Sequence, residues 1–168
     1  KGLQRLQRSG KKLIKLTKQK YVQKTLRRAG KSAAEQIQTA AQDMTGTQLY
    51  AEDGYIPEFK AASERKNMLE RAVGFVCKSS AGRVVRLLQP YDSSVYPQEP
   101  EELPAQWGFV WSTDPEKALR FIALATSPYA TGDCCTESGH VWRSKMDNNT
   151  WNPNEYPSGW EDLGEVTR

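Results

Sequence analysis

In two short stretches of the chain, 84–88 and 141–145, alternate residues would face opposite sides of a strand, and one of the two faces in each stretch carries an arginine. A period of two is typical of a β-strand whose faces meet different surroundings. A glycine, Gly82 or Gly139, precedes each stretch and can supply the positive φ of a tight hairpin turn. The pattern therefore predicts two β-hairpins, with first strands over 74–78 and 133–137.

The start of the chain combines strong helix formers with scattered apolar residues, at Leu13, Leu16, Tyr21, Val22 and Leu26. Gly10 is expected to interrupt this helix and Gly30 to end it, since glycine favours the turn at a helix C-terminus. Ser32 with Glu35 matches a capping box, which predicts a second helix over 33–44.

The segment 46–66 is expected to be a connector. It contains the turn signal Asp53-Gly54 and then residues 55–59, an extended clip because the residue before a proline avoids the helical region. We expect the clip to pack on the first β module, which contains the first of the two predicted hairpins. In 113–128, Thr113 or Asp114 before Pro115 predicts a capped short helix inside a linker that joins the modules.

The chain also contains an internal repeat, since 73–92 resembles 131–149 and 100–107 resembles 153–160. Each copy is predicted to be a hairpin followed by a proline-rich return that brings a tryptophan back to the sheet as a core residue. The matching pairs are Gly74 and Gly132, Cys77 and Cys135, Gly82 and Gly139, Val84 and Val141, Arg86 and Arg143, Pro100 and Pro153, Glu102 and Glu155, Pro104 and Pro157, and Trp107 and Trp160.

These elements predict an α+β fold in which N-terminal basic helices precede two small, related antiparallel β modules. The expected segments are a basic helical arm at 1–45, the connector at 46–66, the first β module at 67–112, a linker at 113–128 and the second β module at 129–168. With 168 residues and a hydrophobic fraction of 38%, several small cores are expected rather than one large core.

Charge divides the chain into two parts. Residues 1–31 contain twelve Lys and Arg and no acid, which leaves twelve basic and 20 acidic residues after them, a net charge of −8. Two segments of opposite net charge indicate that the two parts of the chain have different functions.

Several classes of function lack support in the sequence. Cys77, Cys134, Cys135 and the single His140 do not form a metal-ligand pattern, and we expect reduced, buried thiols and no metal or cofactor. No apolar run reaches membrane-spanning length, and the basic start lacks the features of a signal peptide. No nucleophile elbow, Ser/His/Asp order or phosphate-binding glycine loop is present, so a non-enzymatic protein is expected.

The second repeat resembles the small chitin-binding type of carbohydrate-binding module, through Tyr129, Gly132-Asp133, Cys135, Gly139, Trp142, Pro153 and Trp160. The tandem arrangement over about 44–163 is similar to phage and prophage proteins of tails, baseplates and particle surfaces. Cys135 replaces the valine usual in that family, and the leading tryptophan of chitinase modules is absent. In the first repeat, Arg71 and Val85 stand at the aromatic positions, so that repeat is expected to be structural.

The resemblance implies that exposed aromatic rings contact sugar, with amide and carboxylate groups bonding its hydroxyls. Trp142 and Trp160 are also the residues that so small a module needs in its core, and 147–149 also matches a turn. Trp151 has no counterpart in the first repeat and is the best candidate for an exposed platform. The candidate carbohydrate-binding residues are Tyr129, Trp142, Trp151, Asp147, Asn148 and Asn149.

The basic arm has three open interpretations: docking onto an acidic protein surface, contact with nucleic acid phosphates, or a solvated helix. Its candidate anchoring residues are Lys11, Lys12, Lys15, Lys18, Lys20, Lys24, Arg27 and Arg28. The resemblance predicts a virion accessory protein, made in a bacterial cytoplasm, that forms homo-oligomers and binds other capsid or tail proteins. Host cell-surface polysaccharide is the further expected partner, and a purely structural decoration protein and a nucleic-acid-binding protein are the alternatives.

Overall fold

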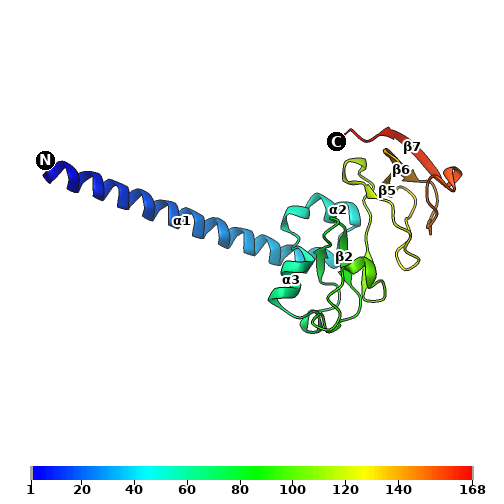
Figure 1. The fold of residues 1–168 in the computed structure, drawn as a ribbon, viewed down its shortest axis with the longest axis horizontal. Coiled ribbons are helices and arrows are strands. Elements are labelled where there is room, and N and C mark those ends of the chain that lie inside the picture. The colour runs from blue at the N-terminus through cyan, green and yellow to red at the C-terminus, as the bar shows by residue number, and fades with distance from the viewer. Residues whose placement is uncertain (1, 168) are drawn as a thin grey trace. The chain divides into compact units, whose positions relative to one another are not determined.

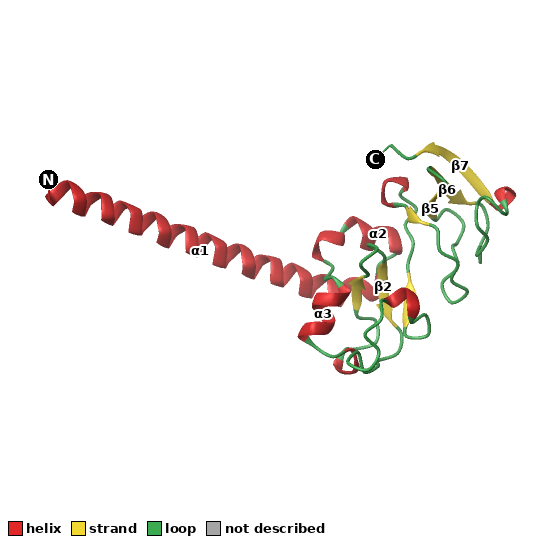
Figure 2. Cartoon of the chain, in the orientation of Figure 1, coloured by secondary structure: helices red, strands yellow, loops and turns green. Residues whose placement is uncertain are grey.

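The computed structural model describes residues 2–167, with side chains described from Lys20 onward. The fold is α+β, as predicted, and the chain divides into two compact units, residues 1–36 and 37–168 (Figure 1). Helix α1 (Gly2–Ala40) forms the first unit as far as Gln36, and its last four residues belong to the second unit. All strands lie in the second unit (Figure 2).

Helix α1 is continuous, so the predicted break at Gly10, the predicted end at Gly30 and the predicted N-cap at Ser32 are wrong. Gly30 does not adopt a positive φ, and a glycine inside a helix costs only about 1 kcal/mol relative to alanine. The helix formers on both sides offset that cost. An exposed pair of Lys31 and Glu35, 3.7 Å apart, follows directly after the glycine.

The end of α1 is set by tertiary contacts. A 3-10 turn, η1 (Ala41–Asp43), follows the helix, and Ala41 is buried. The guanidinium of Arg86 donates from the first sheet to the carbonyl oxygens of Ala41 and, at 2.6 Å, Met44. Gln38 donates to the carbonyl of Val76 and accepts from its N–H. These bonds join the end of the helix to the first β module.

The connector at 46–66 is mostly helical, which corrects the prediction. It contains α2 (Gly46–Ala51), the turn η2 (Asp53–Tyr55) and α3 (Phe59–Arg65), and η3 (Met68–Glu70) follows it. A capping box does occur, but between Thr45 and Gln48 at the start of α2.

The predicted clip packs on the first module, but it is extended only in its middle: Ile56 and Glu58 are extended, whereas Tyr55 ends η2 and Phe59 begins α3. Ile56 and Phe59 are buried, and the N–H of Lys78 donates to the carbonyl of Pro57 at 2.9 Å. The clip therefore runs along the first strand of the first β module.

The first sheet has the order β1-β2-β3, with β1 (Val76–Lys78), β2 (Val84–Leu87) and β3 (Trp107–Phe109) all antiparallel. The second sheet has the order β4-β5-β6-β7, with β4 (Leu119–Arg120), β5 (Cys134–Glu137), β6 (His140–Ser144) and β7 (Trp160–Glu165). Strand β4 runs parallel to β5, so this sheet is not purely antiparallel.

The longer links between strands are irregular and contain single 3-10 turns. The turns η4 (Pro100–Glu102) and η6 (Pro157–Gly159) lie in the proline-rich returns. The helix predicted after Asp114 is only a single turn, η5 (Pro115–Lys117), although the side chain of Asp114 caps it by accepting from the N–H of Glu116 at 3.0 Å. The linker then contributes β4 to the second sheet.

The two modules pair their strands in the same register, which supports the internal repeat. The equivalent pairs are Lys78–Val84 and Thr136–Val141, Cys77–Val85 and Cys135–Trp142, and Leu87–Trp107 and Ser144–Trp160.

The repeated glycines have equivalent conformations as well. Gly74 and Gly132 both have positive φ. The N–H of each donates at 2.8 Å to the carbonyl oxygen at the end of the second hairpin strand, that of Leu87 or Ser144. Ser138 and Gly139 both have positive φ, as a two-residue hairpin turn requires. The repeat is therefore present in the backbone and not only in the residue identities.

The repeated tryptophans are core residues, as predicted, since Trp107 is 0% and Trp160 3% exposed. The core consists of two apolar clusters, and the larger cluster includes residues of both modules. Its aromatic rings form a chain of contacts across the sheets. Trp111 stacks on Tyr129, and Phe121 contacts both Tyr129 and Trp160. A second cluster joins Val76 and Val84 to the helical segments.

Candidate functional site

Tyr129 is a core residue and not a sugar-contact residue. It is 1% exposed, and its ring is stacked between Trp111, at 4.3 Å between centroids, and Phe121, at 5.5 Å. Its hydroxyl accepts a long hydrogen bond from the N–H of Ile122, and burial raises the pKa of Tyr129 far above its usual range. Both ring faces are covered, so the prediction that Tyr129 offers a binding surface is corrected.

Asn149 is also buried, with 0% exposure. Its amide nitrogen donates to Ser144 Oγ at 3.0 Å and to the carbonyl of Gly159 at 3.3 Å. Its amide oxygen accepts from the N–H of Trp151 at 3.1 Å. Asn149 therefore holds the loop before Pro153 in place and is not a candidate for contact with a ligand.

Asp147 and Asn148 are exposed and belong to the turn before that loop. Asp147 accepts a hydrogen bond from the N–H of Thr131 at 2.9 Å, and this bond lowers the pKa of Asp147. Asn148 has φ +54, a left-handed conformation that asparagine tolerates better than most residues. The turn interpretation of these two residues is supported, and both stay accessible.

Trp142 is half-buried on β6 and packs against the shared core. Its indole nitrogen donates to the carbonyl of Glu137 at 3.1 Å, and its ring lies 6.1 Å from that of His140. The hydrogen-bonding group of this indole is therefore already used inside the module.

Trp151 is exposed, as predicted, with 57% of its surface accessible. Its backbone is fixed on both sides, because its N–H donates to Asn149 and its carbonyl accepts from the indole nitrogen of the buried Trp160 at 2.9 Å. An exposed indole on a backbone held by two buried side chains is a preorganised contact surface.

Tyr156 is the aromatic neighbour of Trp151 and was not among the predicted candidates. It is 43% exposed, and the two ring centroids lie 6.2 Å apart with their planes tilted by 51°. A Cβ on Gly159 would lie 2.8 Å from Cδ1 of Tyr156, so the tyrosine ring rests on the Gly159 backbone. The repeat indicated that position 156 suits a large apolar side chain, because the counterpart of Tyr156 in the first repeat, Leu103, packs against the core.

Two asparagines lie close in sequence to this aromatic pair. Asn152 accepts from the N–H of Asn154 at 2.8 Å, and the Asn154 amide donates to Ser138 Oγ at 2.8 Å. The candidate site is therefore the surface of Trp151 and Tyr156 with the amide groups of Asn152 and Asn154 in the same loop.

The basic arm lies on α1. Lys20, Lys24, Arg27 and Arg28 are exposed, together with Tyr21, Val22 and Leu26. The backbone at Lys11, Lys12, Lys15 and Lys18 is helical, but their side chains lie outside the described residues.

The three cysteines are free and buried, and burial is the main cause of the raised pKa of each thiol. Among the described residues, no group of three or more His, Cys, Asp or Glu side chains is placed so that it could hold a metal ion. In the same residues, no helix has the length and apolar character needed to cross a bilayer.

Comparisons of this chain with protein family models, with curated proteins and with solved structures found no match.

Proposed function

We propose that this chain is a non-enzymatic accessory protein of a phage virion or tail-like particle. In this proposal the N-terminal helix attaches the protein to other virion components, and the β modules are displayed and contact host surface glycans. The observation that carries the proposal is the exposed pair of Trp151 and Tyr156 on a loop fixed by buried hydrogen bonds.

The geometry of the aromatic pair favours a compact ligand. Two coplanar rings would suit a long flat polysaccharide chain, but the planes of these two rings are tilted by 51° with 6.2 Å between their centroids, so they do not form one flat platform. The apolar face of a pyranose fits an aromatic ring, and its hydroxyls need amide partners such as those of Asn152 and Asn154. The proposed ligand is therefore a terminal or branching sugar unit.

A binding experiment with the full chain tests this part of the proposal. Trp151→Ala and Tyr156→Ala are expected to lower affinity for a responsive glycan on an array by about tenfold each, which corresponds to about 1.4 kcal/mol. Tyr55→Ala is the matched control, because Tyr55 is an exposed aromatic residue of η2, outside the second module. Equal losses in all three variants would contradict the proposed site. Absence of binding to every polysaccharide would favour a purely structural decoration protein.

The arm supports attachment through its charge. It carries twelve cations and no acid over residues 1–31, and its described basic side chains are exposed. Like charges along a helix repel each other, so an acidic partner would stabilise α1. An acidic surface of another virion protein, or of a second copy of this chain, meets that need.

Deletion of residues 1–31 tests the attachment. The deletion leaves Gln38 and Ala41, which contact the first module, in place, so the modules are expected to stay folded. Particles assembled with the shortened chain are expected to lack it, whereas normal incorporation would contradict the anchoring role. Circular dichroism of the shortened chain provides the folding control.

Contact with nucleic acid is the second candidate for the arm, favoured by the exposed Lys20, Lys24, Arg27 and Arg28 on one helix. Affinity for DNA or RNA would then fall steeply with added salt, because each phosphate contact releases counterions. An intact chain that binds neither at low salt would eliminate this candidate.

A further inference from the structure

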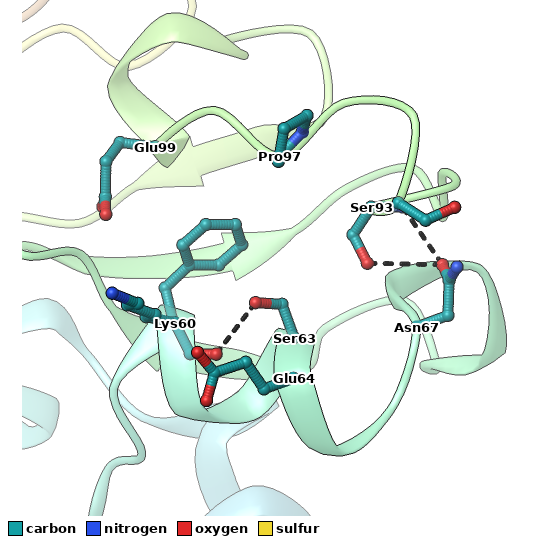
Figure 3. Close-up of a pocket in the computed structure, with 9 residues that line it drawn as sticks. Lys60, Ser63, Glu64, Asn67, Ser93, Pro97 and Glu99 are labelled. Carbon is teal, nitrogen blue, oxygen red and sulfur yellow. Dashed lines mark hydrogen bonds between the residues drawn. The ribbon is translucent and has the colours of Figure 1, made fainter.

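A cleft of about 520 Å³ lies in the first module, between α3 and the loop Ser93–Glu99 (Figure 3). Lys60, Ser63 and Glu64 of α3 form one side, and Pro97 and Glu99 lie on the opposite side. A second hollow of about 360 Å³ shares Phe59, Lys60, Glu64 and Glu99 with the first. Since they share these residues, the two hollows adjoin each other and form one groove, of the size that small-molecule sites typically have.

One end of the groove is held rigidly. Asn67 Oδ1 accepts from the N–H of Ser93 at 3.1 Å (Figure 3). It also accepts from the N–H of Leu69 at 2.9 Å, and the amide nitrogen of Asn67 donates to Asp92 at 2.7 Å. Ser93 Oγ accepts from the N–H of Met68. Because these polar groups use their hydrogen-bonding capacity on one another, they fix the shape of the groove and leave contact with a ligand to other side chains.

The long walls of the groove keep unused hydrogen-bonding groups. Lys60 and Glu64 lie one helical turn apart, yet within the described part of the chain neither has an ion-pair or hydrogen-bond partner for its charged group. Glu99 uses one carboxylate oxygen to accept from the N–H of Ser80 at 3.0 Å. The groove thus offers an ammonium donor and carboxylate acceptors beside the apolar Phe59 and Pro97.

The groove occurs where the first module departs from its duplicate. Seven residues, 93–99, connect Asp92 to Pro100, whereas three residues, 150–152, connect the matching Asn149 to Pro153. Between β4 and β5, where α3 would have its counterpart, the second module has no helix. The extra loop residues of the first module and helix α3 of the connector before it are the parts that build the groove, and the second module forms its three equivalent strands without them.

We infer that this groove is a second saccharide site, separate from Trp151 and Tyr156, and that its ligands are uncharged or amine-bearing oligosaccharides. Hydroxyl-rich ligands match the mixture of donors and acceptors that lines the groove. The carboxylates of Glu64 and Glu99 outnumber the single ammonium of Lys60, so acidic saccharides are disfavoured. The choice of a saccharide rests on the proposed function, and the location and charge preference rest on the groove itself.

Amide NMR spectra of the full chain, titrated with three tetrasaccharides of different charge, test the inference. The probes are tetra-N-acetylglucosamine, tetraglucosamine and tetragalacturonate. The amides of Ser63, Asn67 and Ser94 are expected to shift with the first two probes and not with the third. Glu64→Gln is expected to weaken tetraglucosamine binding about tenfold, since a charge-assisted hydrogen bond is lost. The matched control Glu70→Gln, on η3 outside the groove, is expected to bind as the unchanged chain does.

The Trp151→Ala variant separates the two sites. Shifts at the groove that persist in this variant support the inference. Shifts that occur only at Trp151 and vanish in the variant would overturn the groove assignment and leave the proposed function intact. No shift at either place with any probe would overturn both. Groove amides that respond to a lysine-rich peptide and to no tetrasaccharide would overturn the saccharide assignment in favour of protein docking.

Discussion

The ring of Tyr129 lies 4.3 Å from the ring of Trp111, and their planes differ by 15°. Trp111 follows the last strand of the first sheet, and Tyr129 precedes the first hairpin of the second sheet. This stack therefore joins the two modules into one core, and it explains why Tyr129, which we predicted to contact sugar, is inaccessible.

Tyr129→Ala is expected to destabilise the second unit by about 3–5 kcal/mol, the usual cost of removing a large buried aromatic ring. Because the core is shared, urea unfolding should remain a single transition in which both sheets lose structure together. Tyr129→Phe keeps the stack and loses only a long hydrogen bond at 3.4 Å, so its cost should be no more than about 1 kcal/mol. Two separate transitions, one for each sheet, would contradict the shared core.

Asn149→Ala is expected to cost about 1–3 kcal/mol, because the N–H of Trp151 loses its partner and the donors to Ser144 Oγ and to the carbonyl of Gly159 are removed. Denaturant unfolding measures the loss. Asn148→Gly is the neighbouring control: Asn148 is exposed with φ +54, which glycine adopts freely, so a change within about 0.5 kcal/mol is expected. Similar costs for both variants would show that Asn149 has no special role.

Gly159→Ala should disturb the aromatic pair more than the fold. The new Cβ would press on the Tyr156 ring at 2.8 Å, while the φ of Gly159 is not positive and suits alanine. The indole NMR signal of Trp151 is expected to shift and glycan affinity to fall. Gly139→Ala is the converse control, with φ +80 and no atom within 4 Å, and should cost about 1–2 kcal/mol without moving that signal. An unchanged Trp151 signal in Gly159→Ala would contradict the contact.

Alkaline pH should destabilise the protein through Tyr50. Burial raises the pKa of Tyr50 from 10.0 to about 12, although the hydrogen bond from the N–H of Val84 opposes the shift. The folded-state pKa lies above the unfolded value, so this contribution to stability is fully present below pH 10 and is lost as the pH rises toward 12. Unfolding free energies measured across this window should decline, and the decline should be smaller in Tyr50→Phe. If the unfolding free energy declines equally with pH in the unchanged protein and in Tyr50→Phe, the assignment of this decline to Tyr50 is contradicted.

The sequence by itself determined the framework of each module. The spacing of Gly82 and Gly139 before their strands fixed both hairpin turns, since only a few residues tolerate the positive φ found there. The matched Trp107 and Trp160 were recognisable as core residues because modules this small need a large apolar side chain to close the sheet. The exposure of Trp151 followed from its lack of a counterpart in the other repeat.

Only the tertiary structure decided which residues are accessible. Tyr129 and Asn149 belong to the same module as Trp151, yet contacts with Trp111 and Gly159 bury them, and no local pattern reports such contacts. The end of α1 was likewise set by Arg86, which lies far along the chain, and not by Gly30. Local sequence specifies turns and strand faces through backbone conformation, whereas burial depends on which distant segments pack together.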